Sequence, residues 1–320
     1  MKTGLALGPG AEFDRIRSIV AELGSDAQGI GDDCALLPTG NEFLALSTDV
    51  SVEQVHFRMD WIALREVGWR STAAALSDLA AEAAQPAGIL CALTLPKTRP
   101  EADLLEVMRG VRDAARSVSA PVLGGDLSNG PCWSLAVTVI GRTARPVTRR
   151  GAQPGDGLWV TGELGGSRAA LEAWRRGEQP SSAARARFAR PVPRISVGQW
   201  LGARGARAML DLSDGLAGDV GHLAAASGMA MEIEVERVPV APEVEPEARR
   251  LGLSPQQFAA EGGEDFELLV AMPPEFDGAA LFARECELGL TQVGRVLAGS
   301  GARFLQHGRS VALKGFNHFG

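Results

Sequence analysis

Aspartates recur at turns and beside apolar runs along this chain, and together they could hold metal ions. Asp32 and Asp33 are adjacent in "GIGDDCALL", and Asp78 lies within the apolar stretch "ALSDLAAEAA". Carboxylates that gather in an apolar setting repel one another unless cations neutralise them. Hard oxygen ligands of this kind suit Mg²⁺, whose octahedron substrate phosphates can complete. The remaining acids of the set are Asp49, Asp126, Asp211, Asp214, Glu264 and Asp265.

Each acid has an ordinary interpretation when it is taken alone. An aspartate beside a glycine is common in turns and at helix N-caps, and Asp214 could simply cap a helix that starts at Leu216. The whole set favours a site instead. Each acid follows an apolar run. All except Asp78, which is expected inside an apolar helix, are therefore expected at the ends of buried strands, and strand ends on one side of a sheet meet at one rim. Neutral oxygens adjoin these acids at Ser47, Thr48 and Ser213.

Glycine turns and a pair of arginines add groups that could contact phosphate. The turns "GELGGS" (162–167) and "LGGD" (123–126) could present backbone N–H groups to phosphate oxygens, although tight connections need glycine too. Arg149 and Arg150 could contact a nucleotide or simply lie in a solvated linker. The chain lacks the GxxxxGK[ST] motif and the protein-kinase HRD and DFG motifs. From the residues alone, we expect a metal-dependent enzyme that acts on phosphates.

The composition narrows the class of protein. The chain has 320 residues, a net charge of −7 and a pI of about 5.3, which argues against nucleic-acid or anionic-membrane binding. The sequence shows no signal peptide and no apolar run of about 18 residues, so we expect no membrane span. The four cysteines form no CxxC pair, which argues against zinc and favours reduced thiols in a cytoplasmic protein.

Helical and strand patterns alternate along the chain, so the fold class is mixed α/β. Apolar periodicity predicts helices over 11–23, 61–84 and 101–118, and strands over 43–50, 88–96, 120–128 and 132–142. After a Gly- and Pro-rich boundary near 146–157, a helical segment is expected over 181–205, and a short strand, an acidic turn and a helix over 208–228. Further strands are expected over 229–240, 264–273 and 291–298. At roughly 150 residues per domain, we expect two α/β domains, 1–147 and 148–320.

A series of motifs then becomes recognisable as a set. In chain order, from residue 29 to residue 319, they are "GIGDDCALL", "LSTDVSVEQVHF", "ALSDLAAEAAQP", "LGGDLSNGP", "RRGAQPGDGLWVTGELG", "RPVPRI", "LDLSDGL", "GGEDFELL" and "KGFNHF". Each alone is modest, but the ordered set resembles the thiamine-monophosphate kinase family of the aminoimidazole ribonucleotide synthetase-like superfamily. The resemblance implies a two-domain α/β fold of that superfamily, in which the N-terminal sheet forms a β-barrel across a homodimer.

The resemblance also implies an activity. It implies direct in-line transfer of the γ-phosphoryl group of ATP to thiamine monophosphate, assisted by several Mg²⁺ ions. The products are ADP and thiamine diphosphate, and the reaction is the last step of thiamine diphosphate biosynthesis. No acid or base catalyst is assigned, because the acceptor phosphate, with a second pKa of about 6, is largely deprotonated at pH 7.

Site residues follow from the motif positions. The resemblance implies Mg²⁺ ligands at Asp33, Ser47, Thr48, Asp49, Asp78, Asp126, Asp211 and Asp214. It implies ATP contacts at Gly125, Asp126, Arg149 and Ser213. It implies thiamine-phosphate contacts at His56, Glu264 and Phe316. Asp32 is expected to shape the turn after Gly31 or to support the ligands from behind.

The chain departs from the family pattern in details of substrate contact. Gln54 stands where the family usually has glycine, Phe316 where tryptophan or tyrosine is common, and Phe266 where tyrosine is usual. Two alternatives stay open from the sequence. The chain could be another ATP-dependent enzyme of the superfamily that acts on a different small acceptor. It could also be a non-catalytic nucleotide sensor that binds ATP and Mg²⁺ without turnover.

Overall fold

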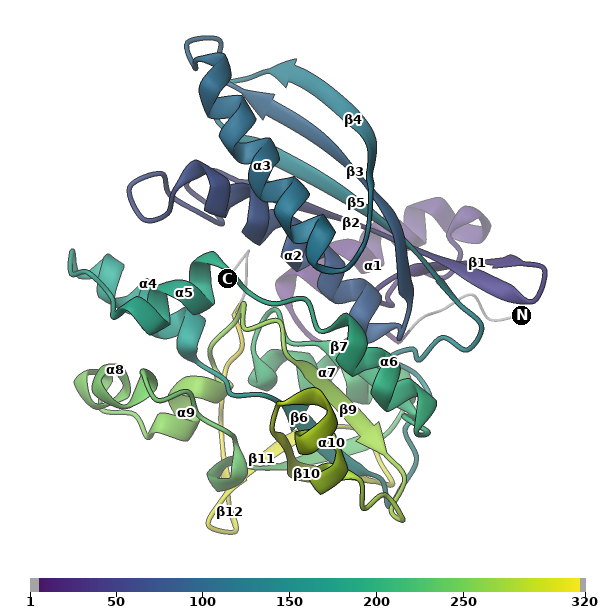
Figure 1. Ribbon diagram of the computed structural model, residues 1–320. Coiled ribbons are helices and arrows are strands. Elements are labelled where there is room, and N and C mark those ends of the chain that lie inside the picture. Colours follow the sequence, from purple (N-terminus) through teal and green to yellow (C-terminus); the bar gives the residue numbers. More distant parts are fainter. Residues whose placement is uncertain (1–5, 317–320) are drawn as a thin grey trace.

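A computed structural model describes residues 6–316, so the last part of the "KGFNHF" motif lies outside the described residues. The N-terminal half forms a five-stranded sheet (Figure 1). Only the β3–β4 pair is parallel within it. Its strands, in spatial order, are β1 (Ala35–Thr39), β2 (Glu42–Val52), β5 (Ser134–Thr143), β3 (Gln85–Leu95) and β4 (Val122–Asn129).

Two helices, α2 (Leu64–Ala81) and α3 (Glu101–Ser117), cover one face of this sheet (Figure 1). Glycines set their close packing. A Cβ atom at Gly68 would lie 2.0 Å from the carbonyl oxygen of Val107, and one at Gly110 would lie 1.9 Å from that of Arg65. Any larger residue at these two glycines would therefore push the helices apart.

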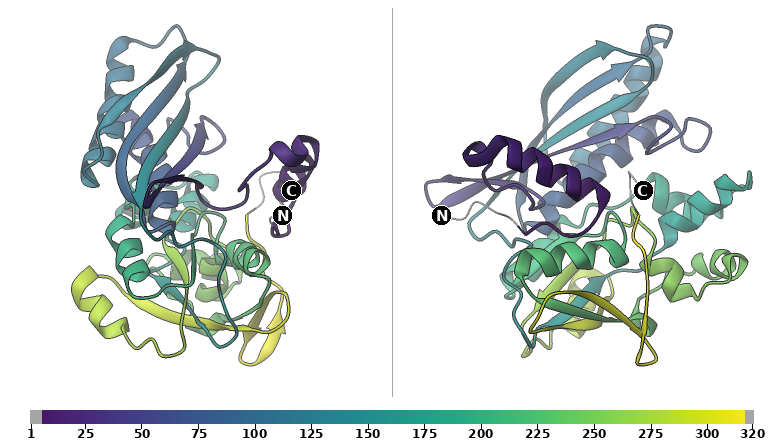
Figure 2. Two further views of the ribbon diagram at one scale, coloured as in Figure 1. Left: turned by 90° about the vertical axis from the view of Figure 1, so that its right-hand side faces the viewer. Right: turned by 180° about the vertical axis from the view of Figure 1, so that it is seen from behind.

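The opposite face of the five-stranded sheet is not covered by α2 or α3, and α1 (Ala11–Leu23) stands apart from it (Figure 2). Alternation along the strands places Leu37, Val50 and Leu90 on this open face, and all three side chains are exposed. Within the described residues the sheet is open, so the β-barrel that the resemblance implied is not formed by one chain.

The C-terminal half forms a seven-stranded sheet with helices packed around it (Figures 1 and 2). Its strands, in spatial order, are β12 (Arg309–Val311), β11 (Gly301–Gln306), β8 (Ala230–Glu234), β10 (Leu290–Leu297), β6 (Gly157–Thr161), β9 (Leu268–Met272) and β7 (Ala208–Asp211). Its helices are α4 (Gly166–Arg175), α5 (Ser182–Ala189), α6 (Ile195–Ala203), α7 (Leu216–Ser227), α8 (Val244–Leu251), α9 (Pro255–Ala260) and α10 (Ala279–Cys286). Short 3-10 turns lie at Gly24–Asp26 and Val235–Arg237.

Helix α2 joins the two halves. Its C-terminal end packs on α6, where a Cβ atom at Gly198 would lie 1.9 Å from the carbonyl oxygen of Ala80. Leu79 of α2, Val197 of α6 and Met209 of β7 belong to one buried apolar cluster. Helix α2 therefore carries residues of the first half into direct contact with strand β7 of the second.

Several details differ from the sequence expectations. The segment 229–240 was expected to be one half-exposed strand, but β8 covers only Ala230–Glu234, and Met231 and Ile233 are fully buried in it. The division at 147 and 148 stays a prediction. In the described range 6–316, none of the helices combines the length and hydropathy needed to cross a membrane.

Candidate active site

Three predicted ligands, Asp33, Asp78 and Asp211, converge where the two halves of the chain meet. One carboxylate oxygen of each lies within 4.8 Å of the other two. Asp33 precedes β1, Asp78 lies in α2, and Asp211 ends β7. Asp78 was expected in a helix and Asp211 at a strand end, and both expectations are confirmed, whereas Asp33 precedes a strand instead of following one. A shared rim of strand ends therefore does not account for the convergence. The convergence comes instead from α2, which places Asp78 beside β7.

Strand β2 adds two more predicted ligands to this group. Ser47 and Asp49 are two residues apart, so their side chains point to the same face of the strand. The hydroxyl of Ser47 donates a hydrogen bond to the carboxylate of Asp78. Burial and the nearby charge of Asp33 raise the pKa of Asp49 to about 6, which places Asp49 in the same electrostatic group. We call Asp33, Asp49, Asp78 and Asp211 the carboxylate cluster.

The carboxylate cluster carries more negative charge than its surroundings neutralise. Burial, followed by the charge of Asp33, raises the pKa of Asp211 to about 8. Burial, followed by the charges of Asp49 and Asp211, raises the pKa of Asp78 well above its usual range. Divalent cations would remove this repulsion, and a donor set made only of carboxylate and hydroxyl oxygens fits Mg²⁺.

Among the described residues, Arg149 places a positive charge against the carboxylate cluster. Its Nη2 donates to Oδ1 of Asp33 at 2.6 Å, and its Nε donates to Oδ2 at 3.1 Å. Its backbone N–H donates to Oδ1 of Asp32 at 2.8 Å, which gives Asp32 the turn-supporting position that the sequence suggested. Arg149 thus contacts both members of the aspartate pair, although its predicted partner was a nucleotide.

A cavity of about 870 Å³ opens beside the carboxylate cluster. Asp49 lies on its wall, and so do Ser213 and Asp214 from the turn between β7 and α7. All three residues predicted to meet the thiamine phosphate also line it, namely His56, Glu264 and Phe316. The cavity therefore gathers predicted metal, nucleotide and substrate residues from both halves of the chain.

The three predicted substrate residues are each held by a local contact. Nδ1 of His56 accepts a hydrogen bond from the backbone N–H of Val52 at 3.1 Å. Glu264 forms an ion pair of 2.5 Å with the buried guanidinium of Arg70. The backbone N–H of Phe316 donates to the carbonyl oxygen of Asp214 at 2.9 Å, which ties the C-terminal segment to the turn that precedes α7.

Not every predicted ligand joins the cluster. The hydroxyl of Thr48 hydrogen-bonds to that of Thr138 at 2.8 Å, on the open face of the sheet. Asp126 lies on the edge strand β4 in register with Ala92 of β3, one position along from the row that contains Asp49. Its exposed side chain therefore points to the open face, away from the carboxylate cluster.

Gly125, the neighbour of Asp126, lies against strand β3. A Cβ atom there would lie 1.8 Å from the carbonyl oxygen of Cys91, so only glycine fits at this position. This packing gives Gly125 a structural reason that is independent of any nucleotide. The roles of Thr48, Gly125 and Asp126 stay predictions.

The aromatic side of the cavity was not predicted from the sequence. Trp61 stacks on Trp174 with ring centroids 5.2 Å apart, and both rings make T-shaped contacts with the ring of Phe188. The guanidinium of Arg70 lies 3.8 Å from the centroid of the Phe188 ring. These four residues line the cavity, so one of its walls is built from aromatic rings and a buried guanidinium.

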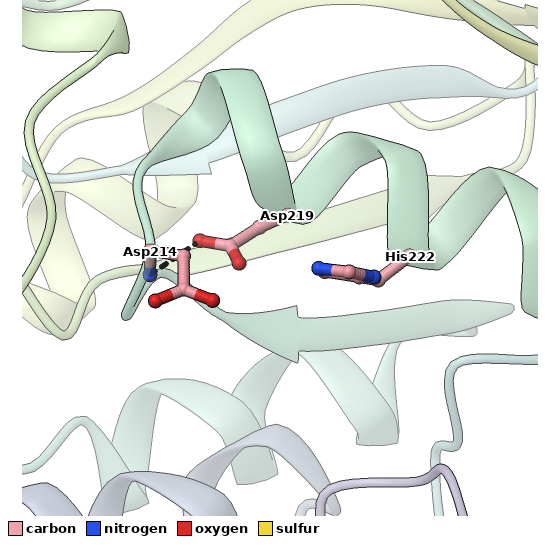
Figure 3. A group of neighbouring side chains, drawn as sticks. All are labelled: Asp214, Asp219 and His222. Atoms are coloured by element: carbon pink, nitrogen blue, oxygen red, sulfur yellow. Dashed lines mark hydrogen bonds between the residues drawn. The ribbon is translucent and has the colours of Figure 1, made fainter. Parts of the chain in front are cut away.

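Three further titratable residues were also missed. Glu82 is fully buried, and one of its oxygens lies within 4.8 Å of one oxygen each of Asp32 and Asp33. Burial, followed by the charges of these two aspartates, raises the pKa of Glu82 to about 10, so its carboxyl group is protonated at neutral pH. Asp219 and His222 of α7 lie near Asp214 (Figure 3). Their three-residue spacing in "DGLAGDVGH" is the signal that could have pointed to them.

Comparisons with known proteins agree with this geometry. Residues 31–143 match the family model "AIR synthase related protein, N-terminal domain", and residues 153–305 match the corresponding C-terminal domain. The thiamine-monophosphate kinase of Aquifex aeolicus is 34% identical over 298 residues, which cover 92% of this chain and 94% of that protein. The thiamine-monophosphate kinase of Escherichia coli K12 is 37% identical over 322 residues, which cover 96% of this chain and 95% of that protein.

A solved structure extends the agreement to three dimensions. The structure described as AaThiL complexed with AMPPCP and TMP superposes with a TM-score of 0.86 at 33% identity and covers 97% of both chains. The likeness thus spans both sheets and the cavity between them. From the two matched domains and these near full-length relatives, we conclude that the chain belongs to the thiamine-monophosphate kinase family, among the AIR synthase related proteins.

Proposed function

We propose that this protein transfers the γ-phosphoryl group of ATP to thiamine monophosphate, giving ADP and thiamine diphosphate. The observation that carries the proposal is the carboxylate cluster beside a cavity that both halves of the chain line, which the cluster reaches through Asp49. Phosphoryl transfer needs alignment and charge neutralisation more than covalent chemistry from the protein. A metal-binding wall beside a cavity of about 870 Å³ supplies both requirements.

The residues that converge are the proposed metal ligands. Asp33, Asp49, Asp78 and Asp211, with the hydroxyl of Ser47, would hold Mg²⁺ ions. Bound there, the ions would offset the repulsion between two anionic reactants, the ATP phosphates and the acceptor phosphate. Asp214 extends this donor set along the cavity wall.

The reactants would be positioned by the chain's own side chains. Ser213 and Arg149 adjoin the cluster and would contact the nucleotide, while His56, Glu264 and Phe316 would contact the thiamine phosphate. Arg70 fixes the carboxylate of Glu264 through their ion pair, so Glu264 enters the cavity in one orientation. No side chain is required to remove a proton from the acceptor, because its phosphate is already largely ionised at pH 7.

The aromatic wall supports a heterocyclic acceptor. Trp61, Trp174 and Phe188 form an interlocked group on the side of the cavity that also holds Arg70. Aromatic faces favour both flat rings and cationic groups, and thiamine monophosphate carries both in its pyrimidine and thiazolium rings. This chemistry distinguishes the proposed acceptor from a plain sugar phosphate.

We also propose that the protein is a homodimer in which the open faces of two five-stranded sheets meet as a β-barrel. The exposed apolar side chains of Leu37, Val50 and Leu90 support this arrangement, because an apolar sheet face of this kind is stabilised by burial. Val50→Asp should give a monomer in light scattering, whereas Leu251→Asp, at an exposed apolar position on α8, should not. A dimer with unchanged affinity in Val50→Asp would contradict the proposal.

We further propose that the protein is located in the cytoplasm. All four cysteines are free thiols, as is usual in a reducing compartment, and this supports the proposed location.

The decisive experiment measures ADP release from ATP and Mg²⁺ with a panel of acceptors. We expect turnover with thiamine monophosphate and none with thiamine or with unrelated phosphate esters. Turnover with another ester alone would assign the protein to a different reaction of the superfamily. Tight binding of ATP and Mg²⁺ without turnover on any acceptor would make it a nucleotide sensor.

A further inference from the structure

The segment 263–266 forms part of the cavity wall in an uncommon backbone conformation. Glu264 and Phe266 have positive φ angles of 64° and 51°, although neither is glycine. Left-handed conformations are unfavourable for residues that carry a Cβ atom, and such strain persists where the surrounding structure enforces it, often at functional sites. Both residues line the cavity. The segment is therefore strained at the place where the acceptor is proposed to bind.

Asp265, between these two residues, does not line the cavity, and its side chain reaches helix α4 instead. Its Oδ2 accepts a hydrogen bond from the backbone N–H of Gly165 at 2.7 Å, and its Oδ1 accepts one from that of Ser167 at 3.3 Å. A carboxylate is favoured there because the first N–H groups of a helix lack intrahelical partners. The glycine turn 162–167 was a candidate for phosphate contact, but two of its N–H groups donate to the chain's own carboxylate.

Backbone hydrogen bonds tie the same segment to the turn between β7 and α7. The N–H of Glu264 donates to the carbonyl oxygen of Ser213 at 2.7 Å, and the N–H of Phe266 donates to that of Leu212 at 3.0 Å. The fit is close, since a Cβ atom at Gly263 would lie 2.5 Å from the carbonyl oxygen of Ser213. The main chain on either side of Asp265 is thus held by one turn, while its side chain fixes the segment to a second element, α4.

The direction of the Glu264 side chain depends on this arrangement. Its carboxylate pairs with the buried guanidinium of Arg70, a residue of α2 in the other half of the chain. Rotation of φ at Glu264 to the negative values that most residues prefer would redirect its Cβ atom and separate the carboxylate from Arg70. Whatever holds the left-handed conformation therefore also sets where this carboxylate enters the cavity.

We propose that Asp265 is a positioning residue for the acceptor. Its hydrogen bonds to α4 hold Glu264 and Phe266 in their left-handed conformations, and these two residues form the wall that meets thiamine monophosphate. The identity of the acceptor rests on the proposed function, whereas the role of Asp265 rests on the geometry. A change at Asp265 should therefore weaken acceptor binding without removing any side chain that lines the cavity.

The first test measures KM and kcat for thiamine monophosphate by ADP release. Asp265→Ala should raise this KM by about 10-fold, the worth of one hydrogen bond to a charged group, and should leave kcat within about 2-fold of the wild-type value. Asp265→Asn keeps an oxygen that can accept from Gly165, so its KM should rise by a smaller factor. This variant also keeps the test open where Asp265→Ala does not fold. An unchanged KM in the folded variants would overturn the proposal.

Two comparisons separate positioning from a purely structural role. Asp156 is a fully buried carboxylate of the same half that accepts the backbone N–H of Gln153 at 2.8 Å and does not line the cavity. Asp156→Ala is the matched control, and it should lower the midpoint of thermal unfolding but keep the wild-type KM. In a Glu264→Gln background, Asp265→Ala should add little to KM, since effects of residues that act through one another are not additive. Fully additive effects, or an equal rise of KM in Asp156→Ala, would contradict the proposal.

A second measurement needs neither turnover nor acceptor. Hydrogen–deuterium exchange, read by mass spectrometry of peptides that contain 263–267, reports on the N–H groups of Glu264 and Phe266. Exchange should be faster in Asp265→Ala than in the wild-type protein and unchanged in Asp156→Ala. Equal protection in Asp265→Ala and the wild-type protein would overturn the proposal even where the kinase assay succeeds. Faster exchange in a protein that does not turn over thiamine monophosphate would support the role of Asp265 and refute only the proposed function.

Discussion

The guanidinium of Arg149 donates hydrogen bonds to both carboxylate oxygens of Asp33, and the backbone N–H of Arg149 donates one to the carboxylate of Asp32. The side chain of Asp33 is 1% exposed and that of Arg149 is 16% exposed, so this ion pair is largely removed from water. Arg149 lies between the last strand of the first sheet and the first strand of the second. The pair therefore links the connecting segment to the turn before β1 and neutralises one member of the carboxylate cluster.

The ion pair between Arg149 and Asp33 predicts that Arg149→Gln destabilises the metal-free protein and that bound Mg²⁺ restores part of the lost stability. Removing one partner of a buried ion pair costs about 3–5 kcal/mol, because the remaining charge stays buried. Bound Mg²⁺ supplies a replacement charge, so the midpoint of thermal unfolding should rise more with Mg²⁺ in Arg149→Gln than in the wild-type protein. Arg150→Gln, at the exposed neighbouring position, is the control and should behave like the wild-type protein. An equal Mg²⁺ effect in all three proteins would contradict this prediction.

The aspartate pair itself should respond unequally to substitution. Asp33 belongs to the carboxylate cluster and binds Arg149, whereas Asp32 accepts a backbone N–H and would support the ligands from behind. Asp32→Asn keeps an oxygen acceptor, so we expect a loss in kcat of about 10-fold, while Asp33→Asn should lose about 100-fold or more. Steady-state ADP release with thiamine monophosphate measures both. The opposite order would show that Asp32 is the ligand.

The raised pKa values in the cluster predict how stability depends on pH. The pKa values of Asp49 and Asp211 are raised to about 6 and about 8, above their unfolded value of 3.8. At pH values between the unfolded pKa and these raised values, the folded, metal-free protein therefore binds more protons than the unfolded chain. Its free energy of unfolding should therefore fall as the pH rises from about 4 to about 8, by ~1.4 kcal/mol per pH unit for each group still titrating.

Mg²⁺ should reverse this dependence because it stabilises the ionised carboxylates. Urea unfolding at several pH values, in EDTA and in saturating Mg²⁺, measures the effect, and Asp211→Asn should flatten the EDTA series above pH 6. Calorimetry in buffers of different ionisation enthalpy should also show protons released on Mg²⁺ binding. Parallel pH profiles in EDTA and Mg²⁺ would mean that the cluster does not bind the metal.

Local patterns in the sequence predicted the elements that carry strong periodicity. The helix expected over 11–23 is α1 (Ala11–Leu23), and that expected over 101–118 is α3 (Glu101–Ser117), since each repeats apolar residues at helical spacing. The strand of 132–142 is β5, whose Leu135, Val137 and Val139 alternate inward. Short strands such as β12 (Arg309–Val311) gave no comparable signal, because three residues cannot establish a period.

The site was predictable as a list of residues but not as an arrangement. Motifs pointed to Asp33, Asp78 and Asp211, yet their convergence depends on α2 crossing to β7 over separations of 45 residues or more. For the residues on strands, position along the strand decides which face of the sheet each side chain points to. Thr48 and Asp49 are adjacent in sequence, but the alternation of β2 sends their side chains to opposite faces. Such placement follows from long-range packing that no single stretch of the sequence contains.

The contact between α2 and α6 gives a last prediction, which separates the assembly of the site from its chemistry. A Cβ atom at Gly198 would lie 1.9 Å from the carbonyl oxygen of Ala80, two residues after Asp78. Because that obstacle is backbone, Gly198→Ala should force α6 away from α2 at a cost of about 1–3 kcal/mol. The shift would also displace Asp78 from Asp211, so kcat should fall although no ligand has changed.

Gly289→Ala is the matched control for this substitution, because a Cβ atom there would meet open space. It should leave both the unfolding midpoint and kcat near the wild-type values. Urea unfolding and ADP release, measured on the same preparations, compare the two variants. Since α2 is the element that joins the halves, the loss of kcat in Gly198→Ala should be partly recovered at high Mg²⁺, which draws the carboxylates together. A stable Gly198→Ala variant with full activity would show that the approach of α2 to α6 does not set the geometry of the carboxylate cluster.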